Sequence, residues 1–425
     1  MKHISSKISL LLMCFMLVGT SAYAETYKYA VKKPAKKAEL ERCRRGQGSA
    51  ELSINNVRAR INTSGNMWYD GSTARYFVPK DGNSTAMFCA ALWIGGQDAN
   101  LQLRVAALKF GQSGDDFWPG PLTVDANASV DKAVCEQWDK HFKITKAEVE
   151  YFVDGFEYNG DQFLGVDASR ATEAIKTWPA HGDASKNQSK FMAPFFDRNG
   201  DGVYSWEDGD YPYYDLSGEL CPAKQKEKWA ELGLPFTPTP TMESDTTNPN
   251  YGTGGVVKAY GGLLVDQVLK GDETIWWVFN DKGNAHTESG SENPIGLEIR
   301  AQAFAFAMND EINNMTFYSY EIINRSTFTL TNTYFSQWVD PDLGYSHDDF
   351  VGCDVERGLG YCYNGKATDG PGTGSYSGNP PAIGIDFFQG PYMDADGRDN
   401  PKVDPYKVAD TYGESALDPY RNADG

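Results

Sequence analysis

The chain has 425 residues, a formal net charge of −19, 13% aromatic residues and 43 glycines. This acidic balance argues against nucleic acid as a partner, because phosphate binding requires clustered basic side chains. It favours divalent cations and good solubility, and the length allows one to three domains.

The N-terminus has the form of a secretory signal peptide over residues 1–24. Lys2 and Lys7 precede the apolar run "ISLLLMCFMLVG", which ends in the small-residue site Ala22-Tyr23-Ala24. Cys14 lies inside this run without the small residue before it that a lipoprotein signal requires. No other run approaches the ~20 apolar residues of a membrane helix. We therefore expect an exported protein without a transmembrane segment in the mature chain.

Residues 25–50 are predicted to be a basic flexible tail, because they are rich in lysine and arginine and lack apolar periodicity. The mature chain has an even number of cysteines, which suggests disulfide bonds in an oxidising compartment. Proximity in sequence suggests only one pair, Cys353–Cys362, and the alternative is that some cysteines are buried thiols. The six cysteines are Cys43, Cys89, Cys135, Cys221, Cys353 and Cys362.

Residues 51–235 are predicted to form a β-rich module with short helices. The segments "SINNVRARINTSG" and "AMFCAALWIGG" are typical of strands, and Thr145 with Glu148 predicts a capped helix over "KAEVEYFVDGF". A second helix is expected from Pro222. Residues 236–255, rich in proline, threonine, asparagine and glycine, are predicted to be a linker or a long loop.

Residues 256–425 are predicted to form a second antiparallel β module. The strands Ile295–Met308, Met315–Asn324 and Phe328–Val339 are expected to form a meander, with Glu273–Asp281 in the same sheet. The predicted fold class is mainly β: one or more antiparallel β-sandwich or jelly-roll-like modules with few short helices and long Asp/Gly-rich loops. The chain ends without a closing strand, and we expect it to be the N-terminal part of a longer protein.

The stretch "DRNGDGVYSWEDGDYP" matches the calcium-loop pattern D-x-[DN]-x-[DN]-G. A calcium ion takes six to eight oxygen ligands, which this pattern supplies on a short bending backbone. The alternative is a plain Asp/Gly turn. The predicted ligands are the side chains of Asp197, Asn199, Asp201 and Asp208 and the main-chain carbonyl of Val203.

Helix-breaking residues flank this loop, and position twelve is Asp208 rather than the glutamate of an EF-hand. We therefore predict a structural calcium site of weak affinity, about 10⁻⁴ to 10⁻³ M, and not a switch. Aromatic residues on both sides are expected to anchor the loop ends in a core. Two further acidic clusters are weaker candidates for calcium, with solvated turns as the alternative. Their candidate ligands are Asp340, Asp342, Asp348 and Asp349 in the first cluster, and Asp394, Asp396 and Asp399 in the second.

The sequence does not predict an enzyme. The four histidines of the mature chain are scattered, and no zinc, nucleophile-elbow, phosphate-loop or dinucleotide motif is present. His181 in "WPAHGD" is interpreted as a hydrogen-bonded structural histidine. Trp68, Trp93 and Trp118 could stack on sugars, but core packing is the default for tryptophan.

Several segments resemble the N-terminal regions of large surface proteins that Bacteroidota export by the type IX secretion system. They include "LWIGGQDANLQLRVAALKFGQSGDDFWPGPL", "WPAHGDASKNQSKFMAPFFDRNGDGVYSWEDGDYP", "DDFVGCDVERGLGYCYNG" and "IGIDFFQGPYMDADGRDNP". The likeness runs from about Ile54 to the end of the chain. It implies a secreted or surface-displayed protein handled by the secretion and sorting machinery, and it implies no catalytic residue. If the chain were complete as given, a periplasmic location would be expected.

These observations together predict a calcium-stabilised structural or adhesive protein without catalysis. Surface glycans and other surface proteins are its expected partners. The alternatives are a glycan-binding module and a secreted hydrolase acting on polysaccharide or peptide. Carboxylate pairs for glycoside hydrolysis are positioned by the fold and cannot be read from local sequence.

Overall fold

A computed structural model of the chain describes residues 42–109, 113–214, 216, 258–259, 262–263 and 268–388. The signal peptide, the helix expected from Pro222, the linker at 236–255 and the acidic cluster at Asp394 lie outside these residues. No helix in the described ranges is long and apolar enough to span a membrane.

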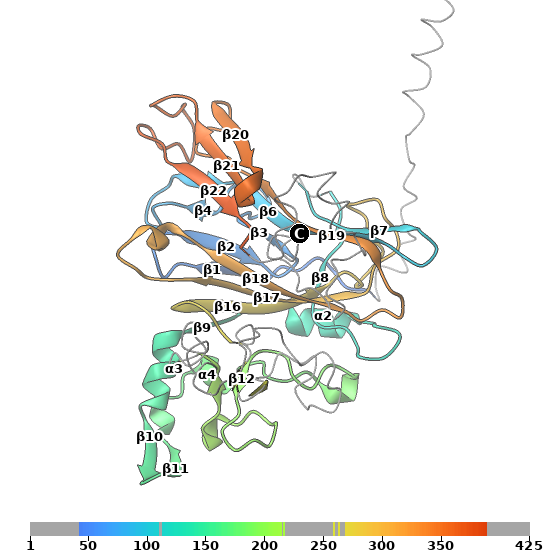
Figure 1. Cartoon of the computed structure of the whole chain (residues 1–425), viewed down its shortest axis with the longest axis vertical. Coiled ribbons are helices and arrows are strands. Elements are labelled where there is room, and N and C mark those ends of the chain that lie inside the picture. The colour runs from blue at the N-terminus through green and yellow to red at the C-terminus, as the bar shows by residue number, and fades with distance from the viewer. Residues whose placement is uncertain are drawn as a thin grey trace, which may run out of the picture. The chain divides into compact units, whose positions relative to one another are not determined.

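Two antiparallel sheets form the centre of the fold (Figure 1). The first has the order β19-β6-β3-β2-β4-β5, with β1 beside β2 and β7 beside β6. The second has the order β18-β17-β16-β8, with β9 also paired to β16. The strands of the first sheet are β1 (Ser49–Leu52), β2 (Arg58–Asn62), β3 (Asn66–Met67), β4 (Tyr76–Phe77), β5 (Thr85–Met87), β6 (Cys89–Gln97), β7 (Leu103–Ala106) and β19 (Thr331–Asp340). Those of the second are β8 (Trp118–Pro119), β9 (Phe142–Thr145), β16 (Glu273–Asn280), β17 (Leu297–Ala305) and β18 (Phe317–Asn324).

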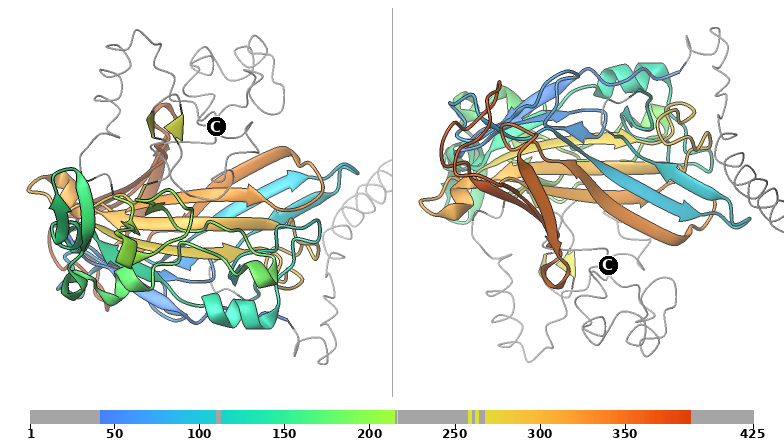
Figure 2. Two further views of the ribbon diagram at one scale, coloured as in Figure 1. Left: turned by 90° about the horizontal axis from the view of Figure 1, so that it is seen from below. Right: turned by 90° about the horizontal axis from the view of Figure 1, so that it is seen from above.

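The two sheets pack face to face around one apolar core. Ile61 and Ile94 from the first sheet meet Trp277, Phe279 and Ile299 from the second in this core. Figure 2 shows the strands of both sheets running in broadly the same direction, as in an aligned sandwich. The fold is therefore mainly β and sandwich-like, as predicted, but a jelly-roll order is not established.

The second sheet is covered on both faces. Trp276 and Val278 point away from the sandwich into a second core, which residues 130–214 build beneath the sheet (Figure 1). Every residue of β16 and β17 is consequently buried. The layer of residues 130–214 covers the face of this sheet that lies away from the sandwich, so β17 is buried on both sides.

Short helices and hairpins build this third layer. The helix expected after Thr145 is α3, and both reciprocal bonds of its capping box with Glu148 are present. The elements of the layer are α2 (Lys132–Trp138), α3 (Lys146–Val153), β10 (Phe156–Asn159), β11 (Gln162–Val166), α4 (Glu173–Lys176), β12 (Phe195–Phe196) and β13 (Tyr211–Pro212).

Strands from both sides of the predicted linker share each sheet. β8 and β9 pair with β16 in the second sheet. β19 does not continue the meander of β16, β17 and β18, as the sequence had suggested, but pairs with β6 across the sandwich. Alternation along a strand shows which side is buried but not which strand is its neighbour, and this explains the error.

A third, smaller sheet follows the sandwich. It consists of β20 (Asp349–Asp354), β21 (Leu359–Asn364) and β22 (Ala382–Asp386), in the order β20-β21-β22. Its inner face places Cys362, Ile383 and Ile385 against the sandwich core. A small hairpin of β14 (Lys258–Ala259) and β15 (Gly262–Leu263) completes the described strands.

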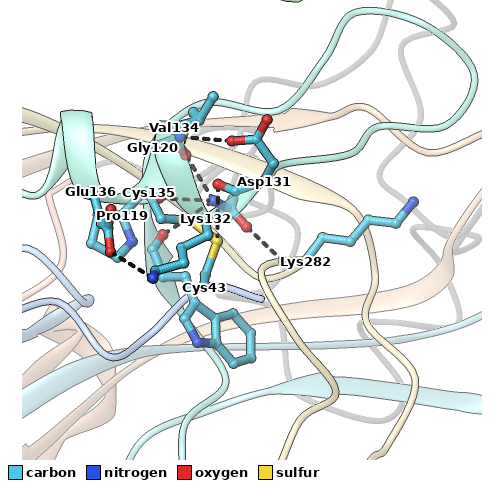
Figure 3. The surroundings of a disulfide bond; sticks show 11 residues. Cys43, Pro119, Gly120, Asp131, Lys132, Val134, Cys135, Glu136 and Lys282 are labelled. Carbon is cyan, nitrogen blue, oxygen red and sulfur yellow. Dashed lines mark hydrogen bonds and ion pairs between the residues drawn. A yellow bond between two sulfur atoms is a disulfide. The ribbon is translucent and has the colours of Figure 1, made fainter. Parts of the chain in front are cut away.

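One disulfide bond joins Cys43 to Cys135 on α2 (Figure 3). It ties the segment that precedes β1 to the third layer, so the end of the predicted flexible tail is fixed there. The pairing of Cys353 with Cys362 is wrong, since both are free thiols. In the β20–β21 register Cys353 lies opposite Gly360 and Cys362 lies opposite Val351. The two cysteines are therefore not cross-strand partners.

Candidate functional site

The loop at Asp197 folds so that its polar side chains turn back onto its own backbone. The two carboxylate oxygens of Asp197 accept hydrogen bonds from the N–H groups of Gly200 and Gly202, each at 2.7 Å. Asn199 Oδ1 accepts from Asp201 N at 3.0 Å. Both glycines have positive φ, 75° and 70°, which the sharp bend of this pattern requires.

Aromatic side chains hold the ends of the loop together. β12 and β13 pair across its base, with Phe196 opposite Tyr211. Phe195 is buried and contacts Tyr204 edge to face, with ring centroids 5.5 Å apart. The Tyr204 hydroxyl donates a hydrogen bond to the carbonyl of Ile175, which fixes the loop to α4. The expected anchoring of the loop in a core is confirmed.

A carboxylate that the sequence pattern did not single out lies at the centre of this arrangement. Asp210 is fully buried, and its two oxygens accept from Arg198 N and Ser205 N, both at 2.8 Å. Burial, together with the negative charges of Asp197 and Asp201, raises its pKa to about 6, although the two backbone N–H donors oppose this shift. In the sequence, Asp210 could have been identified within "DGDYP", where it lies two residues after Asp208, the twelfth position of the calcium-loop pattern.

The other predicted ligands have different surroundings. Asp201 Oδ1 accepts from Val203 N at 2.7 Å, and the Val203 side chain is exposed. Asp208 ends a single 3₁₀ turn, Trp206–Asp208, and is exposed. The structure therefore groups Asp197 and Asp201 electrostatically with Asp210, and the role of Asp208 as the twelfth-position ligand stays a prediction.

His181 supports the loop from outside. Its Nδ1 lies 2.7 Å from the carbonyl of Lys190, and its Nε2 accepts from Tyr204 N at 2.8 Å. This pair of partners selects the neutral tautomer with the proton on Nδ1. Burial lowers the pKa of His181, which agrees with that form. The histidine thus has the structural geometry expected from the sequence.

The second acidic cluster lies where the sandwich meets the third sheet. Asp340 ends β19 opposite Cys89, and burial raises its pKa. Burial also raises the pKa of Asp342 to about 6, with further contributions from Asp340 and Asp349. Asp349 interacts in turn with Asp348, so all four predicted residues are linked electrostatically.

The neighbouring residues Asp348 and Asp349 differ in their hydrogen-bond partners. Asp349 Oδ2 accepts from Leu343 N at 2.9 Å, whereas its buried Oδ1 has no hydrogen-bond partner among the described residues. Asp348 instead accepts from Asn364 Nδ2 at 3.1 Å. A cation beside Asp349 would complete the coordination of its free oxygen, so this cluster stays a weaker prediction for calcium.

Within the described ranges, no three or more His, Cys, Asp and Glu side chains are arranged to hold a metal ion. The calcium pattern at Asp197 depends in addition on an amide and a main-chain carbonyl, which lie outside that class of side chains. Calcium binding by Asp197, Asn199, Asp201, Val203 and Asp208 therefore stays a prediction. The candidates Asp394, Asp396 and Asp399 lie outside the described residues.

Two of the three tryptophans considered for sugar stacking are core residues. Trp68 and Trp118 are buried. Trp93 stacks on Trp338 with ring centroids 5.8 Å apart and donates to the carbonyl of Leu108. Trp93 is half-buried, and one of its ring faces is covered by Trp338.

Comparison of the chain with known protein families, with curated proteins and with solved structures gives no match.

Proposed function

We propose that the chain is a structural or adhesive part of a secreted or cell-surface protein of the type IX secretion kind, stabilised by calcium and without catalysis of its own. The export signal and the resemblance of the quoted segments support the location. The single observation that carries the calcium proposal is Asp210, a fully buried carboxylate beside two further carboxylates.

A cation would change the energetics of this group directly. Burial among negative charges disfavours the ionised form of Asp210, so near neutral pH its charge destabilises the fold. A calcium ion at this loop would offset the negative charges of Asp197 and Asp201 and favour the ionised form of Asp210. Because the same carboxylates accept backbone N–H groups, they shape the loop, which supports a scaffolding role rather than a chemical one.

The test is thermal unfolding at pH 7 with millimolar calcium and with a chelator. If the dissociation constant is about tenfold below the calcium concentration, bound calcium stabilises the fold by about 1 to 2 kcal/mol. The melting temperature of the unmodified protein should therefore be a few degrees higher in calcium. Asp197→Ala combined with Asp201→Ala should abolish this difference, and Asp210→Ala alone should do the same.

Asp125→Ala is the matched control. Asp125 also accepts the N–H of a residue two positions later, in an exposed turn outside the candidate clusters. This variant should keep the full difference between calcium and chelator. Identical melting curves of the unmodified protein in both conditions would rule the calcium role out.

A further inference from the structure

The outer face of the third sheet carries an ordered set of side chains. The strand register places Phe350, Tyr363 and Ala382 in one row across β20, β21 and β22. Gly352, Tyr361 and Gly384 form the next row, and Asp354, Leu359 and Asp386 form the third. The aromatic rings therefore occupy two adjacent rows, and a row with two carboxylates closes one end.

Glycines allow two of these rings to lie against neighbouring backbone. A Cβ atom at Gly352 would come within 2.5 Å of Tyr361 Cζ, so this ring covers the glycine on the adjacent strand. A Cβ atom at Gly365 would come within 2.3 Å of Phe350 Cε2. Any larger residue at either position would push the ring away from the sheet.

The three rings form an aromatic platform in which neighbouring rings are nearly parallel and exposed to solvent. Phe350 and Tyr363 have centroids 5.9 Å apart and planes inclined by 22°, and Tyr361 and Tyr363 have centroids 6.2 Å apart and planes inclined by 29°. Their exposed fractions are 55% for Phe350, 37% for Tyr361 and 45% for Tyr363. Such exposure is unusual for three adjoining aromatic residues, because burying each would be favourable.

The polar end of the platform is acidic. Asp386 is exposed, and Asp354 is paired with Arg357. With a chain charge of −19, this face repels phosphate and other anions, so stacking on nucleotides or acidic polysaccharides is disfavoured. Carboxylate oxygens accept hydrogen bonds from neutral hydroxyl groups without this penalty.

We propose that the outer face of β20, β21 and β22 binds a neutral glycan chain. The apolar C–H faces of successive sugar rings lie on Tyr363 and Tyr361, and hydroxyl groups donate hydrogen bonds to Asp386. The chemistry of the platform selects this occupant, since a pyranose combines a flat apolar face with a rim of hydroxyl donors. The site is separate from the calcium loop and does not depend on it.

A second copy of the chain fits this face less well. Two copies stacked face to face would bury Asp354 and Asp386 of both against aromatic rings, and burying such charges without full pairing is costly.

The experiment measures binding by isothermal titration and by retention on insoluble polysaccharide. The probes are uncharged hexasaccharides of β-1,4-linked glucose, xylose, mannose and N-acetylglucosamine and of β-1,3-linked glucose, with hexagalacturonate as the anionic control. We expect at least one neutral probe to bind and hexagalacturonate not to bind. Tyr361→Ala and Tyr363→Ala should each weaken binding about tenfold or more, as expected when one stacking ring is lost.

Gly352→Ala is the most specific variant, because it keeps every ring and only displaces Tyr361 from its position over Gly352. It should weaken binding, whereas Gly165→Ala on β11, where an added Cβ meets nothing within 4 Å, should leave binding unchanged. Melting curves of all variants verify that they fold.

The proposal is overturned if no neutral probe binds at millimolar concentration, or if Tyr361→Ala and Gly352→Ala bind as well as the unmodified chain. It is also overturned if Tyr361→Ala converts a stable dimer into a monomer, since a second copy would then cover the face. None of these results would affect the melting difference between calcium and chelator, so the two proposals fail independently.

Discussion

At the scale of single residues, His286 is the side chain whose protonation the fold determines most clearly. Its Nδ1 lies 2.7 Å from the carbonyl of Val105 and its Nε2 lies 2.6 Å from the carbonyl of Asp281. Because a carbonyl only accepts, both ring nitrogens must donate, and the imidazole is therefore protonated. The carboxylates of Asp116 and Asp281, at 3.8 and 3.4 Å from the ring, balance the charge.

This geometry predicts that the free energy of unfolding decreases as the pH rises. Burial lowers the pKa of His286, but the opposing contributions of Asp281 and Asp116 raise it to about 8. A raised pKa means that the protonated ring contributes stability in full below about pH 6.5, and that this contribution disappears as pH rises through 8. We expect the free energy of unfolding to fall by about 2 kcal/mol over that window.

Urea unfolding at pH 6, 7, 8 and 9 measures the effect. His286→Gln should be less stable at pH 6 and should lack this part of the pH dependence. His347→Gln, at an exposed histidine, serves as the control. Parallel pH profiles for the unmodified protein and His286→Gln would show that the ring is not charged.

At the scale of secondary-structure elements, β17 is notable for burying charges on the side away from the sandwich. Arg300 Nη2 lies 2.9 Å from Glu298 Oε1, and Arg325 approaches the same oxygen at 3.2 Å. The other oxygen of Glu298 accepts from Leu122 N at 2.9 Å. Burial raises the pKa of Glu298, but the two arginines outweigh it and hold the pKa below its ordinary value. This network joins the second sheet to the loop before α2.

Removing one partner of the network should be worse than removing two. Glu298→Leu leaves Arg300 buried without its main counter-ion, and we expect a loss of about 3 to 5 kcal/mol in the free energy of unfolding. Glu298→Leu combined with Arg300→Met should lose clearly less, because the most deeply buried charge is removed as well and only the partly exposed Arg325 loses its partner. Chemical denaturation of both variants compares them, and a double variant that is less stable than the single one would contradict this account.

At the scale of the whole molecule, the Cys43–Cys135 disulfide closes the longest covalent loop that the described residues show. It connects residues 92 positions apart and ties the segment before β1 to α2. Closing so long a loop restricts the unfolded chain strongly. We expect Cys43→Ser combined with Cys135→Ser to lower the free energy of unfolding by about 2 to 5 kcal/mol.

Melting with and without a reductant measures this contribution. Cys353→Ser, which removes an exposed free thiol, should melt like the unmodified protein under both conditions. A reductant that leaves the melting temperature of the unmodified protein unchanged would argue against a stabilising bond. The buried thiols of Cys89 and Cys362 should react with a thiol reagent only after unfolding.

The sequence by itself determined the features that depend on local chemistry. The mainly β class, the strands β16, β17 and β18 and the capped helix α3 followed from alternation and from a capping pair that act within a few residues. The bend of the Asp197 loop followed in the same way, since its hydrogen bonds join residues at most five positions apart.

Only the tertiary structure decided which distant groups meet. The transfer of β19 to the first sheet, the choice of Cys43 as the partner of Cys135 and the charged layer under β17 all join segments far apart in the chain. The place of Asp210 at the centre of the loop and the aromatic platform over Gly352 likewise require knowing which backbone lies beneath a side chain. Residue patterns show which side of an element is buried, but the partner on that side is chosen by packing of the whole chain, which no local spacing encodes.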